Sequence, residues 1–291
     1  MKSCFYRSMD MDIHYQTEGG GPPFICLHGG KGYTGDCFFP FLSPLADTFQ
    51  MIYLDERGGG KSKPASDKNR VNYAGMAQDI DNLIAHLGAR DAVVLGHSFG
   101  ASLAMYFAQH YPQRVSELYL VSGGHTYDEI HKGWWQKWLA EYERDTGFAP
   151  KRQAVYDLYN SGKISADESF RRVALLGIEE NFHHHKAKAD ILRDMYARTT
   201  LTYIGEENST FHTENAPLEI FRRLSDIKCP TLIVMGQHEV STPIEFFGAM
   251  ARNIPDCEMR VMPRSKHFPY VDEPELFVET IRAFHKSRSL R

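Results

Sequence analysis

Short apolar runs alternate with segments of helical spacing along much of this chain. The predicted strands, most of which are such runs, are residues 24–27, 51–54, 92–95, 118–121, 231–235 and 258–262. The predicted helices are residues 74–88, 101–111, 244–253 and 274–286. Residues 12–16 alternate apolar and polar positions, as a half-buried strand does. Apolar runs separated by helices are typical of a parallel sheet covered on both faces, so the pattern predicts an α/β fold with a mostly parallel sheet.

The pattern changes after residue 124. Residues 125–225 contain all three tryptophans and are predicted to be mostly helical. We therefore expect an α/β core built from residues 1–124 and 226–291, interrupted by a helical cap of residues 125–225. Ligands of open parallel sheets bind beyond the carboxyl ends of the strands. The predicted cap leaves the core at such an end, so it should lie over the active site as a lid.

Composition and charge exclude several classes of function. The chain of 291 residues has 33 basic and 37 acidic side chains, for a net charge of −4, which gives no reason to expect nucleic acid or an anionic membrane as a partner. It carries five cysteines without a CxxC pair, which favours reduced thiols. The first residues lack the apolar run of a signal peptide, and no apolar stretch approaches the ~20 residues of a membrane span. We expect a cytoplasmic protein.

The segment from Gly96 to Gly100 matches G-x-S-x-G and lies between a predicted strand and a predicted helix. This motif needs that context, because the serine sits on a sharp strand-to-helix turn that exposes its hydroxyl. A serine hydroxyl is a weak nucleophile at neutral pH and requires an adjacent base. We therefore predict that Ser98 is the nucleophile of a serine hydrolase.

The base and the acid are expected on the loops after the last two strands. Chain order in this architecture is serine, acid, histidine, and His267 follows the last predicted strand, just before the final helix. Glu239 is the first carboxylate after the preceding strand and would hold the imidazole tautomer and stabilise the imidazolium. Glu245 is an alternative acid, but it falls in the next predicted helix, and Asp272 follows the histidine and breaks the order.

Backbone N–H groups should form the oxyanion hole. One donor is Phe99, directly after the nucleophile. The other should come from the glycine-rich loop after residues 24–27, with Gly30 as the first choice and Gly29 as the next. Removing one such donor typically costs about 2.7–4 kcal/mol of transition-state stabilisation.

The predicted cap contributes two further sets of candidates. Trp134 and Trp138 are candidates to line an acyl pocket, although packing within the cap explains them equally well. The run His183–His185 suggests a metal site, but consecutive helical residues point about 100° apart and cannot converge on one ion. We expect neither a metal nor a cofactor.

Four sequence blocks occur in the order that a known superfamily shows. They are residues 28–32 (His-Gly-Gly-Lys-Gly), 55–62 (Asp-Glu-Arg-Gly-Gly-Gly-Lys-Ser), 96–100 (Gly-His-Ser-Phe-Gly), and 236–243 followed by His267. With them the chain resembles the α/β-hydrolase superfamily over nearly its whole length. The resemblance implies that Asp55 and Arg57 are structural. Superfamily members that are dehalogenases or epoxide hydrolases use an aspartate nucleophile, so Ser98 argues against both chemistries.

Within that superfamily, the H-G-G-x-G block looks most like that of the proline iminopeptidases. The resemblance implies an aminopeptidase acting on a small peptide with an N-terminal residue such as proline. Lys31 replaces the proline usual in that family, and Val240 replaces the acidic residue that binds the substrate amino group. Glu206 and Glu207 in the predicted cap are then the candidates to receive that ammonium group.

Two other functions fit the same residues. A carboxylesterase or lactonase acting on small esters would use the same three side chains. A non-catalytic ligand-binding protein on the hydrolase scaffold is the third possibility, and it has no need of serine, glutamate and histidine together.

Overall fold

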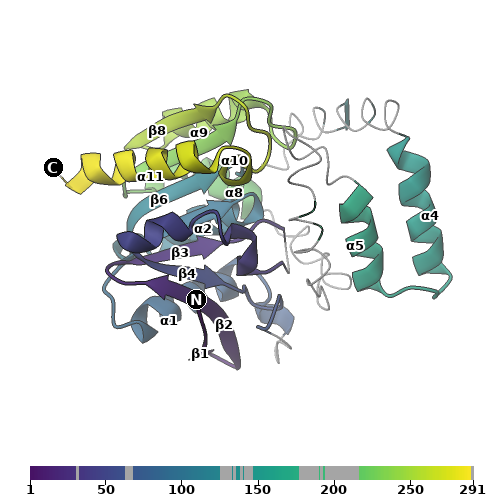
Figure 1. Ribbon diagram of the computed structural model, residues 1–291, viewed down its shortest axis with the longest axis horizontal. Helices are drawn as coiled ribbons and strands as arrows, with labels where there is room; N and C mark the ends of the chain where they lie inside the picture. The colour runs from purple at the N-terminus through teal and green to yellow at the C-terminus, as the bar shows by residue number, and fades with distance from the viewer. Residues whose placement is uncertain are drawn as a thin grey trace.

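The computed structural model describes residues 1–30, 33–62, 68–124, 147–176 and 216–289, together with residues 133, 136, 137, 140, 190 and 193. Figure 1 shows a twisted sheet with helices on both of its faces. Within the described part of the chain, no helix is both long enough and apolar enough to span a bilayer.

Eight strands form one sheet. They are β1 (Lys2–Ser8), β2 (Met11–Gly19), β3 (Pro23–Leu27), β4 (Gln50–Leu54), β5 (Ala92–His97), β6 (Val115–Val121), β7 (Thr231–Gly236) and β8 (Cys257–Met262). Their order across the sheet is β1-β2-β4-β3-β5-β6-β7-β8. β2 pairs antiparallel with β1 and β4. All neighbouring strands from β4 across the sheet to β8 pair in parallel. The mostly parallel sheet predicted from the apolar runs is confirmed.

The central strands are buried along their whole length. Every residue of β3, β5 and β7 is buried. Helices cover both faces of a parallel sheet, so these strands need no polar side, and their sequences are mostly continuous apolar runs rather than alternating patterns.

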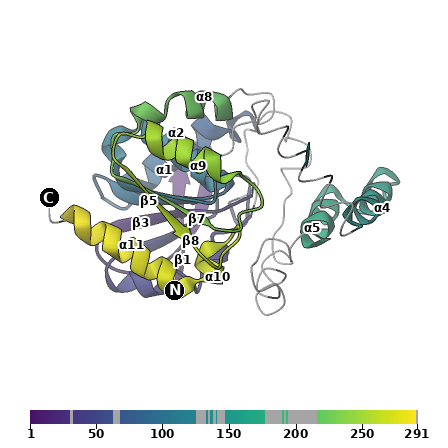
Figure 2. The same ribbon diagram turned by 90° about the horizontal axis from the view of Figure 1, so that it is seen from above.

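Helices of the core lie on both faces of the sheet. The described α-helices are α1 (Tyr73–His86), α2 (Phe99–His110), α4 (Phe148–Asn160), α5 (Ala166–Leu176), α8 (Ala216–Arg222), α9 (Ile244–Asn253), α10 (Pro269–Asp272) and α11 (Pro274–Ser289). Short 3-10 helices are η1 (Gly35–Phe38), η2 (Ser43–Asp47), η3 (Lys68–Arg70), η4 (Pro112–Arg114) and η6 (Leu224–Asp226). Figure 2 shows α1, α2, α8 and α9 on one side of the sheet and α11 on the other, and each face has its own buried apolar cluster.

The described helices between residues 147 and 222 lie within the predicted cap. α4 and α5 run side by side, away from the sheet, in Figure 1. α8, near the end of the predicted insertion, packs instead against α2, where the Gln109 side-chain amide donates to the carbonyls of Ile220 (2.8 Å) and Arg223 (3.0 Å). The division into core and cap stays a prediction.

The loop after β4 is held by buried charges. The Arg57 guanidinium donates to both carboxylate oxygens of Asp79, at 2.8 Å each, and to Asp10 at 2.7 Å. Asp55 accepts from the backbone N–H groups of Gly35 (3.0 Å) and Lys61 (2.9 Å). A buried ion pair is strongly destabilising to break because it leaves an unpaired charge behind. These contacts fix the loop beside the site, in line with the structural role that the resemblance implies.

Candidate active site

Ser98 lies at the sharp turn from β5 into α2. Its backbone has φ 52° and ψ −114°, an uncommon conformation for a residue other than glycine, and its N–H donates to the Val121 carbonyl (2.9 Å). Strained backbone of this kind clusters at functional sites. The flanking glycines are required sterically: a Cβ at Gly96 would lie 2.1 Å from the Gly100 carbonyl oxygen, and one at Gly100 would lie 2.2 Å from the Leu27 carbonyl oxygen.

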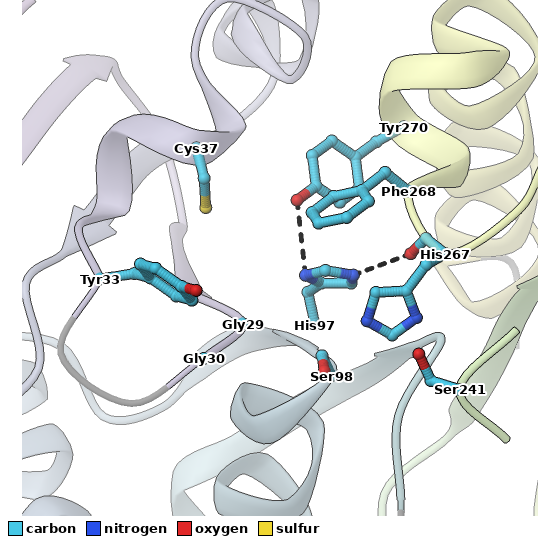
Figure 3. Close-up of a pocket in the computed structure, with 10 residues that line it drawn as sticks. All are labelled: Gly29, Gly30, Tyr33, Cys37, His97, Ser98, Ser241, His267, Phe268 and Tyr270. Carbon is cyan, nitrogen blue, oxygen red and sulfur yellow. Dashed lines mark hydrogen bonds between the residues drawn. The ribbon is translucent and has the colours of Figure 1, made fainter. Parts of the chain in front are cut away.

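His267 and Glu239 meet across two neighbouring loops. Glu239 follows β7 and His267 follows β8, and the two strands are parallel neighbours, so both loops leave the same edge of the sheet. The Nδ1 atom of His267 lies 2.9 Å from Oε1 of Glu239. The His267 side chain is 9% exposed and that of Glu239 is 2% exposed. His267 and Ser98 line the same cavity (Figure 3).

The surroundings of Glu239 favour its ionised form. Its Oε1 also accepts from the backbone N–H groups of Val240 (2.9 Å) and Ser241 (2.8 Å). Burial acts to raise the pKa of Glu239, but the charge of His267 and hydrogen bonds from His267 and the Ser241 N–H outweigh it and lower the pKa to about 2. An ionised carboxylate only accepts, so the proton of neutral His267 sits on Nδ1 and its Nε2 lone pair is available as a base.

The glycine-rich loop after β3 borders the same cavity. Gly29 and Gly30 both line it. Gly30 has φ +70°, and a Cβ there would lie 1.6 Å from the Tyr33 ring, so only glycine fits. Phe99 is the first residue of α2, where backbone N–H groups point out of the helix and favour negative charge. Lys31 and Gly32 of this loop lie outside the described residues.

The cavity has a volume of about 200 Å³. Its lining residues are Gly29, Gly30, Tyr33, Cys37, His97, Ser98, Ser241, His267, Phe268 and Tyr270 (Figure 3). No carboxylate is among these described lining residues. Sequence reasoning missed six of them: Tyr33, Cys37, His97, Ser241, Phe268 and Tyr270. His97 and Phe268 adjoin predicted site residues in the sequence, whereas no pattern singles out Tyr270.

Of the three candidate acids, Glu239 is the one that is hydrogen-bonded to the His267 ring in the described structure. Glu245 is exposed in the first turn of α9. Asp272, in α10, accepts a hydrogen bond from the Lys266 backbone N–H (3.0 Å). The predicted cap residues Trp134, Trp138, Glu206 and Glu207 and the run His183–His185 lie outside the described residues. Among the side chains that are described, no three or more His, Cys, Asp or Glu residues gather as a metal site would require.

Two buried titratable side chains lie behind the glycine-rich loop. His28 donates from Nδ1 to the Gly30 carbonyl (3.1 Å), and burial lowers its pKa to about 4. Burial, reinforced by the charge of Asp55, raises the pKa of Glu56 well above its ordinary value of 4.5. Neither carboxyl oxygen of Glu56 has a hydrogen-bond partner among the described residues. Burial therefore favours the protonated, neutral form of Glu56 in the folded protein.

Glu56→Gln should make stability less dependent on pH. Because the folded pKa of Glu56 lies above its unfolded value, wild-type protein loses stability as pH rises above about 4.5, by up to about 1.4 kcal/mol per pH unit. The glutamine variant lacks this loss. Urea unfolding should show that, between pH 4.5 and pH 7.5, the free energy of unfolding of the variant rises relative to that of wild type. Parallel stability curves would contradict a raised pKa of Glu56 in the folded protein.

The fold and the arrangement of this site define a hydrolase. A family model described as "alpha/beta hydrolase fold" matches residues 22–274, and the chain belongs to that family. A proline iminopeptidase of Neisseria meningitidis serogroup A is 27% identical, over 93% of each chain. The esterase EaEST from Exiguobacterium antarcticum superimposes with a TM-score of 0.74 at 22% identity, covering 98% of this chain and 100% of that one. Est816, described as an N-acyl homoserine lactone degrading enzyme, gives a TM-score of 0.73 at 25% identity over 97% and 100% of the two chains.

Proposed function

We propose that this protein is a serine hydrolase that cleaves a small ester or amide through an acyl-enzyme on Ser98. The observation that carries the proposal is the bond of 2.9 Å between His267 Nδ1 and Glu239 Oε1, beside a cavity that Ser98 also lines. It supports an imidazole whose Nε2 is oriented to remove the proton from the serine hydroxyl.

The reaction then has two halves. Ser98 Oγ attacks the carbonyl carbon while His267 Nε2 takes the hydroxyl proton, and the backbone N–H groups of Phe99 and Gly30 stabilise the oxyanion. His267 gives the proton to the departing alcohol or amine, which leaves the acyl group on Ser98. Water, deprotonated by the same imidazole, releases the acid and restores the free serine.

The described walls of the cavity offer no partner for a free ammonium group, which makes a small ester or lactone the first candidate. The described lining residues offer hydroxyls, aromatic rings and a thiol, but no carboxylate for an ammonium group. The residue after Glu239 is Val240, so no acid stands there either. A charged hydrogen bond is worth about 1.5–3 kcal/mol, so an amine without a partner loses about tenfold or more in affinity.

A proline iminopeptidase is the second candidate. The relative of that name from Neisseria meningitidis supports it, at 27% identity over 93% of each chain. In that case Glu206 and Glu207 of the predicted cap would receive the substrate's amino group.

A panel of three substrates tests the proposal. We expect a short-chain p-nitrophenyl ester to have at least about tenfold higher kcat/KM than prolyl-p-nitroanilide, because the activated ester is intrinsically more reactive and no described acidic group binds the amine to offset that difference. N-acetylprolyl-p-nitroanilide, which lacks the ammonium group, is the matched control. A preference for the free prolyl amine over both other substrates would establish the aminopeptidase instead. Failure to hydrolyse any of these substrates or a wider set of esters and amides would overturn the proposed function.

A further inference from the structure

We propose that His97 is a positioning residue that holds the His267 loop against the nucleophile turn by donating its Nε2–H to the His267 carbonyl. The inference rests on the proposed function, since it concerns the geometry of the same site. Nε2 of His97 lies 2.9 Å from the backbone oxygen of His267, although the two residues are 170 positions apart in the sequence. Figure 3 shows this bond at the wall of the cavity.

The fold leaves the His97 ring little freedom. His97 ends β5, where side chains alternate between faces, so it shares the face of Val93 and Leu95, which is the face that α11 covers. Its ring is 1% exposed and lies 4.7 Å from the Phe268 ring and 5.2 Å from the Tyr270 ring, centroid to centroid.

The same ring contacts the glycine-rich loop. A Cβ at Gly29 would lie 2.5 Å from His97 Nδ1, so the backbone there packs directly on the imidazole. His97 therefore touches the loop expected to bind the oxyanion and the loop that carries the base. Because Ser98 is the next residue, the His97 side chain lies where the glycine-rich loop, the His267 loop and the nucleophile turn meet.

The acceptor fixes the tautomer of His97. A carbonyl oxygen only accepts, so Nε2 must carry a hydrogen. In the neutral ring Nδ1 is then an acceptor, and the Tyr270 hydroxyl lies 3.4 Å from it as the donor. The Ser98 N–H is bound to Val121, so the turn is anchored to the sheet, and the His97 bond ties the base loop to that anchored point.

Two amide variants distinguish the effect of the hydrogen bond to the His267 carbonyl from the effect of any polar side chain at position 97. The side-chain nitrogen of glutamine is as many bonds from Cα as Nε2 of histidine, whereas that of asparagine corresponds to Nδ1. His97→Gln therefore retains a donor that reaches the His267 carbonyl, and His97→Asn does not. We expect His97→Asn to lower kcat for the ester and the rate of Ser98 labelling by a fluorophosphonate by about 10- to 100-fold, because small misplacements of reacting groups have effects of that size.

The outcomes distinguish three cases. His97→Gln should stay close to wild type in kcat, with thermal melting of both variants measured alongside. Equal activity of the two variants would overturn the role of Nε2. If wild-type protein neither labels at Ser98 nor hydrolyses ester or amide substrates, the proposed function is wrong. In that case His97 has no role in catalysis either.

A measurement on wild-type protein avoids variants that fail to fold. Long-range ¹H–¹⁵N correlation spectra of ¹⁵N-histidine protein should show His97 with its hydrogen on Nε2, in slow exchange with solvent. Assignment of that hydrogen to Nδ1 would contradict the proposal, whatever the activity of the protein.

Discussion

Ser98→Ala is expected to lower kcat for the best substrate by about 10⁶-fold, the scale seen when the nucleophile of a serine hydrolase is removed. The variant keeps the cavity and the His267–Glu239 pair but has no atom that can form the acyl-enzyme. The backbone at this position has φ 52°, which alanine and serine adopt with the same strain, so the melting temperature should change little. Steady-state kinetics and a thermal melt on the same preparation measure both effects.

Ser102→Ala is the matched control for this change. Ser102 lies on α2, four residues after the nucleophile, and is buried. This change removes a buried serine hydroxyl from the helix that follows the nucleophile, so activity near wild type is expected. Activity of Ser98→Ala within a few-fold of wild type would show that another group attacks the substrate.

Glu239→Gln is expected to reduce kcat by about 10⁴-fold at neutral pH, as the corresponding acid-to-amide change does in a serine protease, where the histidine takes the wrong tautomer. The amide has nearly the same shape but no charge, so the imidazolium that forms beside Ser98 loses its counter-ion at a site that is 2% exposed. Since the pKa of Glu239 is lowered to about 2, the wild-type carboxylate stays ionised through the usual assay range. Any fall of kcat/KM with decreasing pH that occurs above about pH 4 should then reflect protonation of a group other than Glu239.

Glu245→Gln provides the control for the acid. Glu245 was the rival in the sequence and is exposed at the start of α9. The kinetic constants of this variant should match those of wild type. A large loss in Glu245→Gln together with a small loss in Glu239→Gln would reverse the assignment of the acid.

Strands and motif residues could be predicted from the sequence because their signals are local. The run at residues 92–95 became β5, and the helix predicted at 244–253 is α9, with the same bounds. α2 begins at Phe99, two residues earlier than predicted, because the nucleophile turn passes directly into the helix. β1 could not be predicted from the sequence, because this edge strand buries only Tyr6 and Ser8 and so carries little hydrophobic pattern.

The walls of the cavity could not be predicted, because they depend on how distant loops meet. Tyr33 and Cys37 come from the segment after β3, whereas Phe268 and Tyr270 come from the segment after β8. In the sequence, nothing distinguishes these four residues from ordinary core residues. The bond from His97 to the His267 carbonyl involves a backbone atom, which has no sequence signature at all.

The central claim is that Ser98 is a nucleophile activated by His267. It is tested most directly by incubating the wild-type protein with a fluorophosphonate and locating the adduct by intact mass and peptide mapping. One adduct per chain is expected, on Ser98, and none in Ser98→Ala. An unmodified wild-type protein, or an adduct on a different residue, would contradict it.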